Sequence, residues 1–151
     1  KTVVFNDEPH NFDVIVNTAS PDLVMDMAFG ELAYVGRDFI KFVLPIAHAF
    51  PENVYFLYYA GGEPFTRLVE YKQFTRQNYD TESTIIGMEF PSKNGRYYPL
   101  PLQSEYDKAQ KYFDAMPDGV FSIGRAGSFQ YRVDVDDCIE QAMEAVDSLK
   151  S

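Results

Sequence analysis

The segment from Pro64 to Lys72 contains an arginine whose surroundings call for a negatively charged partner. Its sequence is Pro-Phe-Thr-Arg-Leu-Val-Glu-Tyr-Lys. As a strand it would place Arg67, Val69 and Tyr71 on one face, because side chains alternate along a strand. An arginine among apolar neighbours either binds an anion or pairs with an acidic side chain. The sequence leaves both interpretations open, an anion site and a structural salt bridge within a sheet.

Two tyrosines offer a second set of polar groups. Tyr97 and Tyr98 directly precede Pro99. Their phenol hydroxyls could donate hydrogen bonds to a phosphate. The alternative is that their rings simply cover the face of a sheet.

From residue 120 onward the sequence predicts a strand, a glycine turn and a helix. The apolar run 120–123 favours a short strand, and Gly124 and Gly127 favour a turn. Asp134 is suited to cap a helix in which apolar residues recur at helical spacing from 135 to 149. This arrangement directs free backbone N–H groups toward an electron-rich ligand atom. An ordinary strand–turn–helix connection explains the same pattern.

The sequence contains no recognisable catalytic set of its own. Cys138 is the single cysteine, and His10 and His48 are far apart without metal-ligand spacing. We find no Ser-His-Asp or Cys-His arrangement, no metal site and no pair of acids placed for acid–base catalysis. The catalytic residues therefore stay unassigned, and any reaction must depend largely on a cofactor.

Composition limits the partners. The 151 residues carry a formal charge of −10, and 46% of them are hydrophobic. An acidic chain is repelled by nucleic acid and by anionic membranes, so neither is an expected partner. The sequence shows no apolar run of membrane-spanning length and no signal peptide. A single cysteine fits a reducing compartment, so we expect a cytoplasmic protein.

The elements that must position these residues indicate an α+β fold. Consecutive strands without intervening helices predict an antiparallel sheet in the middle of the chain. The run 12–18 is continuously apolar, which is typical of a strand covered on both faces, yet the chain supplies little to cover it. The N-terminal part therefore looks like a piece of a larger fold. The expected strands are 2–5, 12–18, 32–50, 53–60, 65–74, 84–90 and 120–123. The expected helices are one that begins at Pro21, with Ser20 as its cap, and ends at Gly30, and those at 104–116 and 135–149.

Several segments occur in the order found in one enzyme family. The most specific are Thr-Arg-Leu-Val-Glu-Tyr-Lys at 66–72 and Gly-Arg-Ala-Gly-Ser-Phe-Gln-Tyr at 124–131. They resemble Thr-Arg-Ile-Ile-Glu-His-Lys and Gly-Arg-Leu-Gly-x-Tyr-x-Tyr of UDP-galactopyranose mutases and their close flavoprotein relatives. Further landmarks are 12–22, 29–34, Glu89-Phe-Pro91 and Tyr97-Tyr-Pro99. The chain is similar to the C-terminal half of that family, almost from end to end.

The resemblance implies an FAD-dependent isomerase that interconverts UDP-galactopyranose and UDP-galactofuranose, an activity of cell-wall polysaccharide biosynthesis. In that family N5 of the reduced flavin attacks the anomeric carbon, UDP leaves, and a flavin iminium lets the sugar ring open and reclose. Carried over to this sequence, Arg67, Tyr98 and Tyr131 would bind the phosphates of the nucleotide sugar. Gly124, Arg125 and Asp134 would lie near the flavin.

The resemblance also implies a division of the chain. Residues 1–22 would belong to the edge of an FAD-binding α/β domain, 23–117 to a substrate-binding sheet, and 118–151 to the return into the FAD domain. The glycine-rich FAD fingerprint is missing, and Gly61-Gly62 lacks its strand–turn–helix context. We therefore expect this chain alone to be inactive and not to retain FAD. Its expected partners are a UDP-galactose-like nucleotide sugar and its own N-terminal FAD domain, with a homodimer as a further option.

Three positions depart from the family pattern and leave the reaction open. Val133 stands where the family has an acid, Val35 where it has an arginine, and Tyr71 where it has a histidine. These changes are compatible with a different sugar or a different reaction. The alternatives are a related FAD-dependent amine-oxidase-like oxidoreductase and a non-catalytic module that binds a nucleotide sugar.

Overall fold

The computed structural model describes residues 1–75 and 81–150. Two compact units make up the chain. Unit 1 combines Lys1–Tyr34 with Arg96–Ser151, and unit 2 consists of Val35–Gly95. The chain crosses between the units twice, once on either side of unit 2. Both units contain helices and strands, and the protein has an α+β fold, as the sequence predicts.

Unit 1 contains two small pairs of strands. Strands β1 (Thr2–Phe5) and β2 (Glu8–Asn11) form an antiparallel hairpin. Strand β3 (Ile15–Asn17) pairs in parallel with β9 (Val120–Ser122), although more than a hundred residues separate them in sequence. A short strand, β8 (Tyr98–Pro99), follows the second crossing of the chain.

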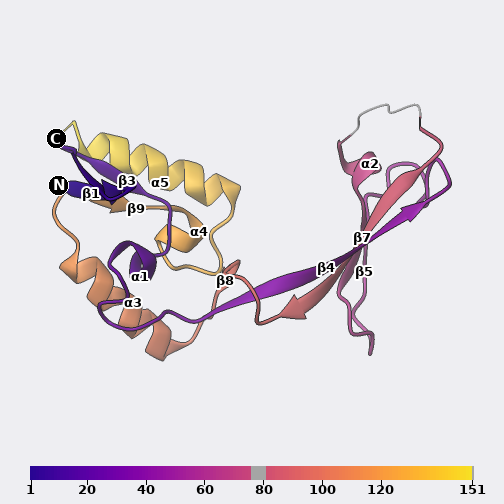
Figure 1. The fold of residues 1–151 in the computed structure, drawn as a ribbon, viewed down its shortest axis with the longest axis horizontal. Coiled ribbons are helices and arrows are strands. Elements are labelled where there is room, and N and C mark those ends of the chain that lie inside the picture. The colour runs from indigo at the N-terminus through magenta and orange to yellow at the C-terminus, as the bar shows by residue number, and fades with distance from the viewer. Residues whose placement is uncertain (76–80, 151) are drawn as a thin grey trace. The chain divides into compact units, whose positions relative to one another are not determined.

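The helices of unit 1 lie around the β3–β9 pair. They are α1 (Pro21–Val24), α3 (Gln103–Ala115), α4 (Gly124–Gly127) and α5 (Val135–Ser148). Figure 1 shows α5 running alongside β3 and β9, and α3 on the other side of these strands. No helix in the described part of the chain is long and apolar enough to span a membrane.

A small core holds unit 1 together. Its buried side chains are Leu32, Ala109, Tyr112 and Phe129. The Tyr112 hydroxyl accepts a hydrogen bond from the backbone amide of Phe29 at 2.9 Å and donates one to the carbonyl of Gly30 at 2.8 Å. Because the buried hydroxyl has a partner both as donor and as acceptor, Tyr112 can be fully buried without an unpaired polar atom.

Unit 2 is built on an antiparallel sheet. The strands are β4 (Tyr34–Leu44), β5 (Phe56–Tyr58), β6 (Arg67–Glu70) and β7 (Thr84–Ser92), in the order β5-β6-β7-β4. Figure 1 shows β4 and β7 as its long central pair. Gly36 of β4 is a required glycine, because a Cβ atom there would overlap the carbonyl oxygen of Asn94.

The predicted strand 65–74 is wrong in its second half. Strand β6 ends at Glu70, and Tyr71–Thr75 forms the short helix α2. The buried Glu70 carboxylate accepts the amides of Ala49 and Phe50 at 2.9 and 2.8 Å, and the Thr84 hydroxyl at 2.7 Å. These bonds fix the neighbouring loop and end the strand. Tyr71 therefore lies in α2 and does not share the strand face with Arg67 that the sequence predicted.

Two further expectations about the N-terminal segment are corrected. The strand predicted at 12–18 is limited to β3, and Val16 within it is 53% exposed, since the chain supplies little to cover it. Ser20 occupies the N-cap position of α1, but its side chain makes no capping bond. The Ser20 hydroxyl donates to the Asp22 carboxylate instead.

Candidate functional site

In unit 2, two arginines share one buried carboxylate. Arg67 donates to Glu89 Oε1 through Nε at 2.9 Å and through Nη2 at 2.7 Å. Nη2 of Arg67 also reaches Oε2 at 2.8 Å, and Nη1 of Arg37 donates to the same oxygen at 2.6 Å. The salt bridge that the sequence left open for Arg67 therefore exists, and a second arginine takes part in it.

The register of the sheet brings these three side chains together. Arg67 of β6 lies directly opposite Glu89 of β7, and Phe39 of β4 lies opposite Glu89 on the other side. Arg37 is two residues before Phe39, so it projects from the same face of the sheet. A cross-strand cluster of this kind depends on three strands from separate parts of the chain.

Burial and hydrogen bonding act in opposite directions on the pKa of Arg67. Glu89 is 3% exposed, whereas the Arg67 and Arg37 side chains are 27% and 29% exposed. Burial by itself would lower the pKa of Arg67, but the hydrogen bonds to Glu89 and Tyr58 outweigh it and raise the pKa above its usual value. Both arginines thus keep part of their guanidinium surface open to solvent.

Aromatic rings border the open side of the cluster. The Arg67 guanidinium carbon lies 5.9 Å from the ring centre of Phe56 and 5.7 Å from that of Tyr58. Nη1 of Arg67 also contacts the Tyr58 hydroxyl at 3.4 Å. These contacts hold the flat guanidinium group in one orientation.

Unit 1 brings together the other residues that the sequence singled out. The rings of Tyr98 and Tyr131 lie 5.8 Å apart, and the Arg125 guanidinium carbon lies 5.1 Å from the Tyr98 ring centre. Nε of Arg125 donates to the carbonyl of Val133 at 2.8 Å. Tyr131 also lines an open pocket of about 480 Å³, together with aromatic residues of α3. The three predicted residues of unit 1 thus form one contiguous group.

The predicted glycine turn is a single helical turn instead. Gly124 begins α4 with φ +76°, a backbone angle that favours glycine. Its amide donates to Gln141 Oε1 at 2.7 Å, so this N–H is not available to a ligand in the way the sequence suggested. Gly127 packs onto β3, since a Cβ there would lie 2.7 Å from the carbonyl oxygen of Asn17. Both glycines are explained by local geometry.

The predicted cap of the C-terminal helix is confirmed. Asp134 is the N-cap of α5, and it forms a capping box with Asp137. The Asp134 amide donates to Asp137 Oδ2 at 2.8 Å, and Asp134 Oδ1 accepts the Val135 amide at 3.0 Å. These bonds satisfy N–H groups that the first turn of a helix otherwise leaves unpaired.

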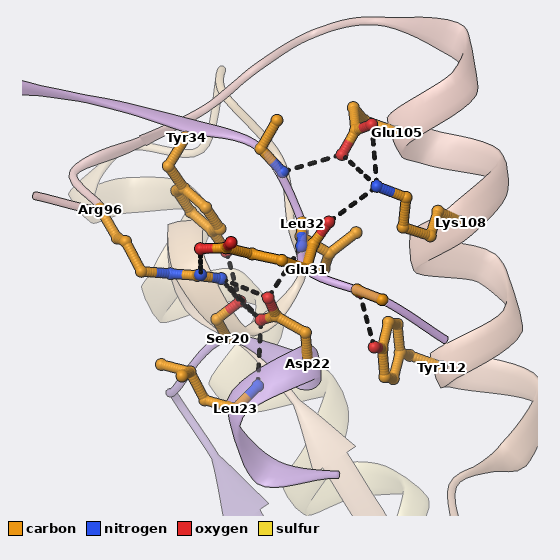
Figure 2. A network of polar contacts seen from close by, with 12 residues as sticks. Ser20, Asp22, Leu23, Glu31, Leu32, Tyr34, Arg96, Glu105, Lys108 and Tyr112 are labelled. Carbon is orange, nitrogen blue, oxygen red and sulfur yellow. Dashed lines mark hydrogen bonds and ion pairs between the residues drawn. The ribbon is translucent and has the colours of Figure 1, made fainter. Parts of the chain in front are cut away.

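A buried network fixes the segment that leads into Tyr98. Figure 2 shows Arg96 lying along the ring of Tyr34 and ending at Asp22. The guanidinium carbon is 4.3 Å from the ring centre, and Nη2 lies 2.7 and 2.6 Å from the two Asp22 oxygens. The Leu32 amide also donates to Asp22 Oδ2, at 2.8 Å. Arg96 is thereby anchored two residues before Tyr98.

Sequence reasoning missed the residues that complete these clusters. It singled out neither Arg37 nor Arg96 and gave no role to Asp22. Glu89 was noted only as part of a family landmark. The pairing of β4 with β7, which brings Arg37 to Glu89, cannot be read from residue spacing alone.

Comparison with known protein families covers most of the chain, including most of the residues described above. The family model for UDP-galactopyranose mutase matches residues 2–131. The chain belongs to the UDP-galactopyranose mutase family. The match includes Arg67, Glu89, Tyr98 and Arg125, and it ends at Tyr131, before the Asp134 cap.

A solved structure supports the fold of this family member. It is described as a crystal structure of reduced UDP-galactopyranose mutase, with a TM-score of 0.73 and 16% sequence identity. The match covers 98% of this chain and 42% of the mutase chain, so this chain spans less than half of that protein's length. No curated protein matches the sequence significantly.

Proposed function

We propose that this chain forms part of an FAD-dependent enzyme that binds a UDP-galactose-like nucleotide sugar and interconverts its pyranose and furanose forms. Membership of the mutase family supports the reaction class. The observation that carries the binding role is the partly exposed Arg67, fixed in orientation by Glu89. A guanidinium group held in this way is suited to a phosphate oxygen, because its planar N–H groups are already aligned.

Arg67 of unit 2 would neutralise the diphosphate of the nucleotide sugar, and Tyr98 and Tyr131 of unit 1 would donate their hydroxyl groups to phosphate oxygens. The mutual ring packing of the two tyrosines limits their rotation, which supports a role in orienting a ligand. This interpretation makes the charged and phenolic donors binding residues. It assigns no acid or base to the reaction.

Arg125 fits a flavin ring better than a phosphate. Arg125 is one-third exposed beside the start of α5, where Asp134, Asp136 and Asp137 are clustered. These acids would repel a phosphate, whereas a neutral or electron-rich ring can lie against the arginine. When bound, reduced FAD supplies the nucleophile of the isomerisation. Arg125, stacked on Tyr98, would contact and orient it.

The rest of the FAD-binding domain is the partner we propose for α5. Four apolar side chains at helical spacing are between half and three-quarters exposed along this helix: Val135, Ile139, Met143 and Val146. An amphipathic helix normally covers such a stripe against other parts of the fold. The match covers 42% of the mutase chain, and the FAD-binding domain that we propose as the partner would account for the uncovered part.

The binding role is tested by calorimetric titration of the full-length protein with UDP. Arg67→Ala should weaken UDP binding by about 10- to 150-fold, because a charge-assisted pair contributes about 1.5–3 kcal/mol. Arg67→Lys should recover only part of this loss, since the fork of donors is absent. Lys93→Ala, which removes an exposed charge from the same unit, is the matched control and should leave binding unchanged. Unchanged UDP affinity in Arg67→Ala together with a lower melting temperature would make Arg67 a structural residue.

The cofactor assignment has its own measurement. Without a glycine-rich phosphate loop, the 151-residue chain should lose FAD during gel filtration, while the full-length protein should stay yellow. Stoichiometric flavin on the isolated chain would contradict this division of labour. Binding of UDP-galactose by a flavin-loaded full-length protein without any isomerisation would instead indicate a binding module.

A further inference from the structure

The segment that carries Tyr98 is anchored on both sides of that residue. Two residues before it, Nη2 of Arg96 lies 2.7 and 2.6 Å from the two carboxylate oxygens of Asp22. Two residues after it, the Leu100 amide donates to the carbonyl oxygen of Ala33 at 2.9 Å. Tyr98 thus lies in the middle of a short span whose two ends are both bound to the N-terminal part of unit 1.

One ring, that of Tyr34, supports the segments of both tyrosines. The Arg96 guanidinium carbon lies 4.3 Å from its centre (Figure 2). The Phe129 ring packs nearly perpendicular to it, with the ring centres 5.4 Å apart. Phe129 is 1% exposed and stands two residues before Tyr131. Arg96 stands the same number of residues before Tyr98. The Tyr34 ring therefore sets how these two segments lie relative to each other.

The backbone at Phe129 is in a conformation that needs such support. Its φ is +49°, in the left-handed region that bulky residues seldom adopt. Conformations of this kind persist where the surrounding structure fixes them, and they concentrate at functional sites. The Phe129 ring packs on Tyr34 and, with ring centres 6.1 Å apart, on Tyr106. This packing fixes the direction in which the chain continues to Tyr131.

Arg96 is a costly choice for a side chain that only stabilises the fold. Its Nε is buried and has no hydrogen-bond partner among the residues that the structure describes. A buried donor without a partner costs free energy, and an apolar side chain at this position would avoid that cost. The ion pair with Asp22 instead gives the guanidinium group one defined place and orientation. These contacts favour a role for Arg96 in setting geometry.

We propose that Arg96 is a positioning residue, which holds the Tyr98 segment against the Tyr34 ring and so fixes the spacing of the two tyrosines that bind phosphate oxygens. This inference rests on the proposed nucleotide-sugar function. The two tyrosines, Tyr98 and Tyr131, have ring centres 5.8 Å apart. Arg96 acts through them, because each of its terminal nitrogens is bound to a carboxylate.

The test combines Arg96→Met with Tyr98→Phe in calorimetric titrations of the full-length protein with UDP. Methionine keeps an unbranched, flexible side chain that can pack on the ring, but it removes the ion pair. Arg96→Met should weaken UDP binding by about tenfold, the loss of one well-placed hydrogen bond to a charged group. In the Tyr98→Phe background the same change should alter the affinity less than about twofold, because the hydroxyl group that Arg96 positions is then absent.

Two further variants complete the series. Arg96→Lys can still pair with Asp22, and it covers the case in which the methionine variant does not fold. It should show an intermediate UDP affinity, and its effect should also disappear in the Tyr98→Phe background. Lys111→Ala, which removes an exposed positive charge from the same unit, is the matched control and should leave UDP affinity unchanged.

The same loss of UDP affinity in both backgrounds would mean that Arg96 does not act through Tyr98, and it would overturn the proposal. Unchanged UDP affinity in Arg96→Met would overturn it as well. Tyr98→Phe and Arg67→Ala, each measured alone, test the proposed function. If both leave UDP binding unchanged, that function fails and this inference fails with it. If both weaken binding and Arg96→Met does not, only the role of Arg96 is lost.

Discussion

Asp22 in unit 1 and Glu89 in unit 2 are both buried carboxylates that bind arginine, but their surroundings differ. Asp22 is fully buried and faces Arg96, the Ser20 hydroxyl and the amides of Leu23 and Leu32. Glu89 faces two arginines. One acid thus accepts from one arginine and from neutral donors, while the other accepts from two arginines.

The two acids therefore connect different parts of the molecule. The donors to Asp22 come from α1, from the segment before β4 and from Arg96, so this network joins parts of unit 1. Arg96 stacks on Tyr34, which covers one side of its guanidinium group. Glu89 instead joins β7 to β4 and β6 through Arg37 and Arg67.

The largest effect should come from removing Asp22. Asp22→Ala should lower the free energy of unfolding by about 3 kcal/mol, the lower end for a broken buried pair, since Arg96 is a quarter exposed. Glu31→Ala is a matched control, because Glu31 also pairs with Arg96 but is 74% exposed. It should cost less than about 1 kcal/mol. Denaturant unfolding measures both, and equal losses would contradict a structural role specific to Asp22.

Acidification should reveal the same network. Burial would raise the pKa of Asp22, but hydrogen bonds from Ser20, Leu32 and Arg96 outweigh it and lower the pKa below its usual value. Because the folded pKa lies below the unfolded one, this stabilisation is fully present above the unfolded value and is lost as pH falls toward the folded value. The free energy of unfolding should therefore fall below about pH 4, by at most about 1.4 kcal/mol per pH unit for this group.

Asp22→Asn should make the free energy of unfolding fall less steeply as the pH is lowered. Glu70, whose pKa is lowered by the Thr84 hydroxyl and the Ala49 and Phe50 amides against the opposing effect of burial, should keep part of it. Unfolding curves recorded from neutral pH downward would measure the slope. An unchanged slope in Asp22→Asn would show that Asp22 contributes nothing to acid sensitivity.

The smallest expected effect tests the Glu89 cluster. Glu89→Gln leaves two arginines without their carboxylate, so an added anion should partly replace it. Pyrophosphate at ten times its dissociation constant should stabilise this variant by about 1.4 kcal/mol, seen as a higher melting temperature. The same addition should not stabilise Asp22→Asn beyond the unmodified protein. Equal responses of the two variants would remove the distinction between them.

The local elements of this fold were readable from sequence, whereas the contacts between distant segments were not. The Asp134 cap was predicted because an acid before an apolar helical pattern has a defined partner within three residues. The end of β6 at Glu70 was missed, because it depends on amides of a loop some twenty residues earlier. A charged residue in an apparent strand can thus mark the end of the strand when its side chain binds backbone amides of a distant loop.

In the candidate site, too, local signals were readable from the sequence and contacts between distant segments were not. Arg67, Tyr98, Arg125 and Tyr131 stand out because of their residue types and their family landmarks. Arg37 carries no such signal, and its relation to Arg67 arises from the β4–β7–β6 register. Register is fixed by the sum of many pairings along three strands, so no single spacing in the sequence reveals it.

The Glu70 carboxylate has a consequence for the motions of unit 2. Ala49 and Phe50 lie outside regular secondary structure, yet their amide protons are held by one buried acid. Loop amides normally exchange with solvent hydrogen quickly, but these two should exchange as slowly as amides of a sheet. Since one carboxylate holds both, they should be released in the same opening event. The exchange rates of this pair would then report how often the end of β6 opens.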